Sequence, residues 1–359
     1  MMKSACSSPA RAGYAGVALV TFVLAMPARA ADDRQVKVQP DALHFGTVRQ
    51  GAIAEGSVRV LMKGDSADGI DARAEAPAFL KVLDVKTGTH TYSNLGSRVY
   101  CDVMVAVDTE KVGNFAGLLR LHVGGESVSP RVTVTVAPRA AESIRILVAN
   151  TPFEKFSTSD SHIFDTWKEI VETGNLDPDY LDLGQGPVLR NLDLSQYDVI
   201  FLSGGGIVGI HEEDYARLKD FIVQGGHVVI AASHFMGGSV PKANRILAEC
   251  GLQMRDSELQ DEVVIGKAKD LPRSEFTEGV TSLRVHRLTP VKVEEGATAT
   301  YLIKGAPDGE GFAALGRFGK GSVVALGVPL WWSWIAGERA TNADNARFLQ
   351  NVLSRTKAR

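Results

Sequence analysis

A serine and a histidine stand side by side at Ser233-His234, directly after the apolar run of residues 227–232. A hydroxyl can act as a nucleophile and an imidazole as its general base, so the pair suggests a hydrolase of the serine–histidine type. Neighbouring side chains at a strand end point in opposite directions, and we therefore expect His234 to point away from Ser233. Another histidine would have to act as the base. The candidates are His162, His211 and His286.

Residues 204–209 read GGGIVG and satisfy the G-x-G-x-x-G pattern of dinucleotide-binding loops. Three features count against a nucleotide. The helix expected next begins with the acidic residues 212–214, which would repel a pyrophosphate. Strand 227–232 ends without an acidic residue for a ribose, and the unit lies mid-domain instead of on the first strand–helix turn. We expect no nucleotide, and interpret the acidic trio as dipole compensation at a solvated helix start.

Strand and helix patterns alternate through the second half of the chain and would position these turns. The expected strands are 144–149, 197–202 and 227–232, followed by 298–303, 312–318 and 322–326 with a turn at 319–321. The first expected helix starts near 161 and stops at Gly174, the second starts at 212, the third carries Ile246 and Leu247 and is closed by Gly251, and the last covers 342–353. The polar, proline-containing segment between residues 175 and 196 shows neither pattern. Such alternation predicts a doubly wound, mostly parallel α/β sheet with helices on both faces and antiparallel members near its end.

The first half has a different pattern, because residues 35–137 show apolar residues at every second position. The clearest run is Val99, Cys101, Val103, Val105 and Val107. Period-2 runs broken by turns are typical of a β-sandwich of about seven strands. We therefore predict four segments: a signal peptide at 1–30, a β-sandwich at 31–138 that ends at Pro138, a short polar hinge at 139–142 and the α/β domain at 143–356.

The sandwich resembles bacterial Ig-like domains of the abnormal-spindle/hydin type. The resemblance rests on LHFGTV at 43–48, followed by Gln50-Gly51, and on GNFAGLL at 113–119. It implies a spacer or a module that binds a protein partner.

The α/β half resembles class I glutamine amidotransferase-like domains, and within them the uncharacterised, non-glutaminase branch related to auxiliary domains of gliding-motility and intraflagellar transport proteins. The resemblance covers residues 143–354. It rests on six stretches in order: YDVIFLSGGG, LKDFIVQGGHVVIAAS, NRILAECGL, EFTEGVTSL, GRFGKGSVVALGVPLWW and DNARFLQNVL.

In catalytic members of that family a cysteine occupies the turn after the strand equivalent to 227–232, and a late His-x-Glu pair assists it. Here the turn offers Ala232 or Ser233, the last histidine is His286, and Glu338 stands apart from it. Because the chemistry needs a thiol, we do not expect glutaminase activity.

Composition sets the compartment and the partners. The net charge of -3 and the lack of basic clusters argue against nucleic acid. Residues 1–30 combine Lys3 and Arg11, an apolar run at 14–26 and a small-x-small site ending at Ala30, which predicts a cleaved signal and a periplasmic or secreted protein. No later stretch is long and apolar enough to span a bilayer. Cys101 and Cys250 are expected to be buried and unpaired.

The eight histidines form no HxH or HExxH pattern, so neither a metal nor another cofactor is expected. The predicted ligand site is a crevice at the carboxyl edge of the sheet, walled by aromatic rings, for a small polar ligand or a sugar. Its residues are Ser203, Gly204, Gly205, Ser233, His234, Trp331 and Trp332. The sequence thus favours an exported, non-catalytic binding or scaffolding protein. The alternative is a periplasmic Ser/His-dependent hydrolase acting on a carbohydrate or peptide-derived substrate.

Overall fold

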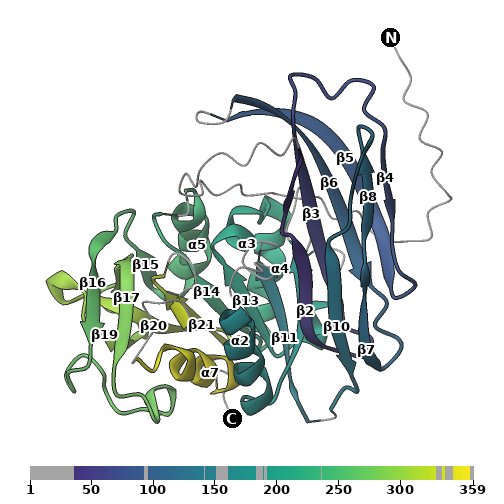
Figure 1. Cartoon of the computed structure of the whole chain (residues 1–359). Coiled ribbons are helices and arrows are strands. Elements are labelled where there is room, and N and C mark those ends of the chain that lie inside the picture. Colours follow the sequence, from purple (N-terminus) through teal and green to yellow (C-terminus); the bar gives the residue numbers. More distant parts are fainter. Residues whose placement is uncertain are drawn as a thin grey trace.

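The computed structural model describes residues 36–92, 96–140, 142–150, 161–182, 189, 192–235, 237–328, 334–335 and 343–355. An N-terminal β part stands beside an α/β part built on a mixed sheet (Figure 1). The predicted signal peptide, residues 1–30, and the predicted site residues Trp331 and Trp332 lie outside the described residues.

The N-terminal part contains strands β1 (Val36–Gln39), β2 (Ala42–Arg49), β3 (Glu55–Lys63), β4 (Ala72–Glu75), β5 (Leu80–Tyr92), β6 (Gly96–Val107), β7 (Gly113–Leu118), β8 (Arg120–Val123), β9 (Glu126–Val128) and β10 (Arg131–Ala137). They form sheets in the orders β1-β3-β6-β5, β2-β10-β7 and β4-β8-β9. The described residues thus hold more strands than the seven expected. One reason is that regular pairing breaks at the buried Leu119, where the chain passes from β7 in one sheet to β8 in another.

The period-2 pattern places the core of this part as predicted. The alternating residues of β6, Val99, Cys101, Val103 and Val105, are each at most 1% exposed. Side chains of a strand alternate between faces, so one apolar row per strand is enough to build the shared core.

The α/β part contains β11 (Ile144–Asn150), α2 (Ser161–Thr173), β12 (Leu176–Asp182), β13 (Val199–Ser203), α3 (Gly204–Val208), α4 (Glu212–Val223), β14 (His227–Ala231), α5 (Ser239–Leu247), β15 (Leu252–Met254), β16 (Leu259–Ile265), β17 (Leu283–Leu288), β18 (Val291–Val293), β19 (Thr300–Lys304), β20 (Gly311–Phe318), β21 (Gly321–Leu326) and α7 (Asn345–Arg355). The main sheet runs β12-β11-β13-β14-β21-β20-β18-β15, with β19 beside β20. Strands β12 to β21 in this order are parallel, whereas β20, β18, β15 and β19 pair antiparallel. The sheet is therefore mixed to a greater extent than the sequence indicates.

Helices cover both faces of this sheet. Along β13, Val199 and Phe201 pack with α2 and α7, while Ile200 and Leu202 pack with α3, α4 and α5. Because both faces are covered, every residue of β13 is buried, which explains its continuous apolar run.

Strand β12 occupies the segment in which the sequence showed no regular element. It pairs with β11 along its full length, and its other side faces the N-terminal part, where the Tyr180 N–H donates to the carbonyl of Ile53 at 2.8 Å. Because Asp177 and Asp179 are buried within β12, the strand lacks the apolar pattern by which its sequence would have predicted it. The contact with the N-terminal part covers what would otherwise be an open sheet edge.

Charged side chains join the two parts beside β12. Arg139, from the predicted hinge, lies 3.0 Å from Asp177 and 3.1 Å from Asp179, and the side chain of Asp177 is 0% exposed. One apolar cluster also runs through both parts, from Phe45 of β2 to Trp167 of α2. Arg139 is thus anchored between the two parts and not exposed in a free linker.

Candidate functional site

The carboxyl edge of the parallel strands brings most of the predicted site residues together. Ser203 lies opposite Ala231 in the β13–β14 pairing, so Ser203 and Ser233 end neighbouring strands at the same edge. Gly204 and Gly205 begin α3 directly after β13, and neither has a positive φ. The glycine run is thus a helical turn instead of the loop expected from the sequence. The segments after β11 and β21 at this edge, 151–160 and 329–333, lie outside the described residues.

Ser233 is held inside its own turn. The residue is 0% exposed, and its Oγ accepts a hydrogen bond from the Phe235 N–H at 3.0 Å. Its remaining hydrogen bonds join its backbone to the Ser239 hydroxyl, which donates to the Ser233 carbonyl at 2.8 Å. Among the described residues no histidine bonds to Ser233, so its hydroxyl organises the turn.

His234 points away from Ser233, as the alternation of side chains predicts. The backbone N–H of His234 donates to the Thr289 hydroxyl at 3.0 Å, and its ring Nδ1 lies 2.8 Å from Asp256 Oδ1. The imidazole is about half exposed, at 47%. A carboxylate on Nδ1 fixes the ring orientation and leaves Nε2 as the open nitrogen.

Next to His234, the guanidinium of Arg287 lies over the exposed ring of Phe235. Phe235 is 44% exposed, and the guanidinium carbon of Arg287 lies 4.3 Å from its ring centroid. Arg287 also lies 3.7 Å from Glu258, whose side chain is only 7% exposed. Sequence reasoning missed Asp256, Glu258 and Arg287, because they come from segments that only the fold brings to the edge. No motif marks them.

The acidic start of α4 has two different roles. Asp214 is fully buried and accepts hydrogen bonds from the N–H groups of His211 at 3.0 Å and Leu189 at 3.1 Å. Glu212 is exposed and binds Arg245 of α5, which lowers the pKa of the Glu212 carboxyl. The expectation that all three acids lie on a solvated helix start is therefore wrong for Asp214, whose carboxylate turns inward and accepts these two N–H groups.

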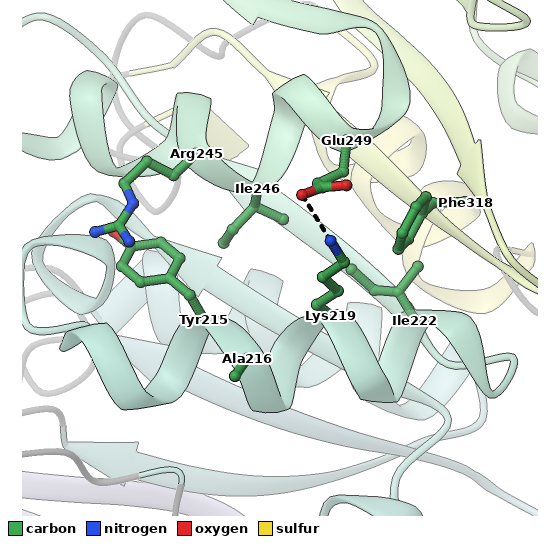
Figure 2. A pocket seen from close by; sticks show the side chains of 8 residues that line it. All are labelled: Tyr215, Ala216, Lys219, Ile222, Arg245, Ile246, Glu249 and Phe318. Carbon is green, nitrogen blue, oxygen red and sulfur yellow. Dashed lines mark hydrogen bonds and ion pairs between the residues drawn. The ribbon is translucent and has the colours of Figure 1, made fainter.

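A groove of about 310 Å³ runs between α4 and α5 (Figure 2). Its walls are Tyr215, Ala216, Lys219, Ile222, Arg245, Ile246, Glu249 and Phe318. Lys219 Nζ and Glu249 Oε1 form an ion pair across it at 2.9 Å, while Tyr215 and Phe318 stand at opposite ends. None of the predicted site residues lines this groove, which arises from helix packing and leaves no local sequence signal.

Both cysteines of the described chain lie in apolar surroundings. Cys101 and Cys250 are buried and unpaired. Burial raises the pKa of the Cys101 thiol to about 11 and that of the Cys250 thiol to about 12. Neither thiol is therefore an activated nucleophile at neutral pH.

The described residues contain neither a cluster of metal ligands nor a helix able to span a membrane. They hold no group of three or more His, Cys, Asp or Glu side chains placed to bind a metal ion. Their helices are all too short or too polar to cross a membrane.

The last strong sequence motif, Asp344-Asn345, ties the final helix to an earlier segment. Asp344 accepts hydrogen bonds from the Thr281 N–H, the Ser282 N–H and the Thr281 hydroxyl, which lower its pKa against the opposing effect of burial. Asn345 bonds to the backbone of Arg284 and to the Trp334 carbonyl. The two side chains therefore tie the start of α7 to residues 281–284. The buried Trp334 belongs to the core, with its ring centroid 5.3 Å from that of Phe312.

Comparisons with known proteins assign no family. No protein-family profile and no curated protein matches the chain. Among solved structures, the cytoplasmic protein STM1381 of Salmonella typhimurium LT2 is 18% identical over 60% of this chain and 100% of its own, with a TM-score of 0.45. An ASH/PapD-like domain of human CEP192 is 13% identical over 34% of this chain and 99% of its own, with a TM-score of 0.22. The VesB protease of Vibrio cholerae is 16% identical over 29% of this chain and 32% of its own, with a TM-score of 0.19. Similarity at these levels assigns no function.

Proposed function

We propose that this chain is an exported, non-catalytic binding or scaffolding protein that joins an Ig-like sandwich to an amidotransferase-like domain lacking the nucleophile. One observation carries the proposal. At the turn where the resembling enzymes place a cysteine, this chain has Ser233, whose Oγ is buried and accepts the Phe235 N–H. A nucleophile must be exposed to substrate and bonded to a base, and neither condition holds for this hydroxyl among the described residues.

The strand order supports the amidotransferase-like, flavodoxin-like interpretation of the α/β part. Counted within this part, the five parallel strands β11, β12, β13, β14 and β21 lie in the order 2-1-3-4-5. That is the order of flavodoxin-like doubly wound sheets, which bind ligands outside the carboxyl ends of their strands. The proposed ligand, a small polar molecule or a sugar, would contact Ser203, Gly204, Gly205, Ser233 and His234, with Trp331 and Trp332 as walls.

The joint between the two parts supports a scaffolding role. Arg139 is held by Asp177 and Asp179, and the Tyr180 N–H bonds to Ile53 across the joint. An Ig-like domain of the abnormal-spindle/hydin type fixed in this way would present a protein partner at a defined position relative to the ligand edge. We propose that it acts in the periplasm or outside the cell.

The second candidate function is a Ser/His-dependent hydrolase of carbohydrate or peptide-derived substrates. The arrangement that favours it is the His234–Asp256 pair at 2.8 Å, in which a carboxylate orients an imidazole as in a base–orienter pair. Ser233 is not its partner in this structure, so the hydrolase would need another nucleophile or an activated water.

One set of assays separates the two functions. Purified protein comprising residues 31–359 is tested for glutaminase and for ester, amide and glycoside hydrolysis, alongside Ser233→Ala and His234→Asn. A thermal-shift screen against sugars, amino acids and peptidoglycan fragments is run on the same samples with Trp331→Ala. The proposal predicts binding without turnover. Turnover that His234→Asn or Ser233→Ala abolishes would establish the hydrolase instead.

A further inference from the structure

Three segments that are far apart in the sequence meet beside the turn that follows β14. His234 and Phe235 follow β14, Asp256 and Glu258 lie between β15 and β16, and Arg287 belongs to β17. The contacts that join them are His234–Asp256 at 2.8 Å, Arg287–Phe235 at 4.3 Å and Arg287–Glu258 at 3.7 Å. A carboxylate thus lies beside both the His234 imidazole and the Arg287 guanidinium, and Arg287 lies over the exposed Phe235 ring.

The backbone of Arg287 is strained at this point. Its φ is +57°, in the left-handed region that glycine and asparagine occupy far more readily than arginine. The pairing of β16 with β17 shifts register between Leu259 and Glu262, opposite this residue. Irregularities of this kind re-aim a side chain, and such strain persists where the surroundings impose it, often at binding sites.

Arg287 and His234 keep unused hydrogen-bonding groups. The Arg287 side chain is 32% exposed, and its contacts with described residues are the Phe235 ring and Glu258, with no hydrogen bond from the guanidinium. His234 forms hydrogen bonds through its backbone N–H and its ring Nδ1, and within the described chain its ring Nε2 forms none. With the proton on Nδ1 toward Asp256, a neutral His234 presents Nε2 as an acceptor.

We propose that Arg287, Phe235 and His234 form a binding site for a carboxylate that has a hydroxyl or amide N–H beside it. The planar guanidinium matches a carboxylate with two parallel hydrogen bonds. Nε2 of His234 accepts from the neighbouring hydroxyl or amide, and the exposed Phe235 ring packs against the ring or aliphatic body of the ligand. Sugar acids and peptide C-termini share this chemistry. The inference rests on the proposed binding function and names the ligand class for the same edge of the sheet.

The test is isothermal titration calorimetry on the chain comprising residues 31–359, at fixed pH and salt. The probes are D-glucuronate and N-acetyl-alanyl-alanine, each beside its uncharged counterpart, glucose and the dipeptide amide. We expect at least one acid to bind and both uncharged probes to bind about tenfold more weakly or not at all. The acid that binds identifies the source of the carboxylate.

Arg287→Asn is the decisive variant, because asparagine tolerates the left-handed backbone. It should weaken acid binding about tenfold or more, and because it removes an ion-pair partner of the nearly buried Glu258 it should also lower the melting temperature. A purely structural arginine would lower the melting temperature and leave the affinity of the folded variant for the acid unchanged. Arg120→Gln, at an exposed arginine of β8 in the N-terminal part, is the matched control and should change neither quantity.

Two results would overturn the inference: neither acid binds, or an acid binds equally well to Arg287→Asn. In the first case, a ligand found by the thermal-shift screen would still leave the proposed binding function standing. The proposed function itself fails only if turnover that depends on His234 or Ser233 is observed.

Discussion

Replacing Asp177 probes how the two parts of the molecule are joined. Its carboxylate is fully buried, lies 3.0 Å from Arg139 and 4.0 Å from Arg49, and accepts from the Ser143 hydroxyl at 3.4 Å. Burial raises the pKa of Asp177, and this effect outweighs the lowering by Arg139. The charged form of Asp177 is therefore disfavoured in the folded state relative to an exposed aspartate.

The loss in the free energy of unfolding depends on which side chain replaces the carboxylate of Asp177. Asp177→Ala removes a partner of the partly buried Arg139 and leaves a hole where the buried carboxylate was, which should lower the free energy of unfolding by about 3 kcal/mol. Asp177→Asn keeps the size and an acceptor oxygen, while Arg139 retains Asp179 at 3.1 Å. Because burial dominates the pKa of Asp177, we expect the asparagine variant to lose about 1 kcal/mol or less.

Urea unfolding followed by tryptophan fluorescence measures both variants, since the Trp167 indole donates to the Tyr180 hydroxyl beside this joint. A raised carboxyl pKa means that the folded state binds the proton more tightly, so Asp177 makes stability fall as pH rises from the ordinary aspartate pKa through the raised one. Asp177→Asn should remove that part of the slope. An asparagine variant as unstable as the alanine variant, or with an unchanged pH slope, would refute the reasoning.

Three further predictions concern local features. Asp214→Ala should lower the free energy of unfolding by about 2 kcal/mol in thermal denaturation, because the buried N–H of Leu189 and the partly buried N–H of His211 lose their acceptor, whereas Asp220→Ala on the exposed side of α4 should have little effect. Gly319→Ala should lower the free energy of unfolding by more than about 1 kcal/mol, and by more than Gly309→Ala does. Both glycines have a positive φ, but only a Cβ at 319 would meet the backbone, 2.6 Å from the Val223 Cα, so equal losses would contradict this prediction. Neither Cys101 nor Cys250 should react with Ellman's reagent at pH 8 in the folded chain, and both should react in urea; fast labelling of the folded chain would show an exposed thiolate.

Apolar periodicity is enough to predict the strands whose residue pattern follows from burial of one face or of both faces. The alternating row of β6 and the continuous run of β13 each follow from how many faces of the strand are covered. The helix ending at Gly174 and the turn at 319–320 were likewise predicted, since their sequences meet local backbone requirements.

Elements stabilised by distant partners could not be predicted from local patterns. Strand β12 contains Asp177, Pro178 and Asp179, a polar sequence that becomes a buried strand only because Arg139 and the N-terminal part cover it. Asp214 is likewise buried by the contact with Leu189.

The candidate site shows the same division. The turn after β14 and the direction of His234 follow from strand geometry. The residues that surround His234, namely Asp256, Glu258 and Arg287, are placed by a register shift in β16–β17 and by a strained backbone, which no spacing in the sequence indicates.

The central claim is that Ser233 serves the turn and not a reaction. Incubation of the chain comprising residues 31–359 with a fluorophosphonate, followed by intact-mass and peptide mass spectrometry, tests this directly. Because the hydroxyl is buried and bonded to the Phe235 N–H, we predict no adduct on Ser233. Stoichiometric phosphonylation of Ser233 that is lost in His234→Asn would contradict the account.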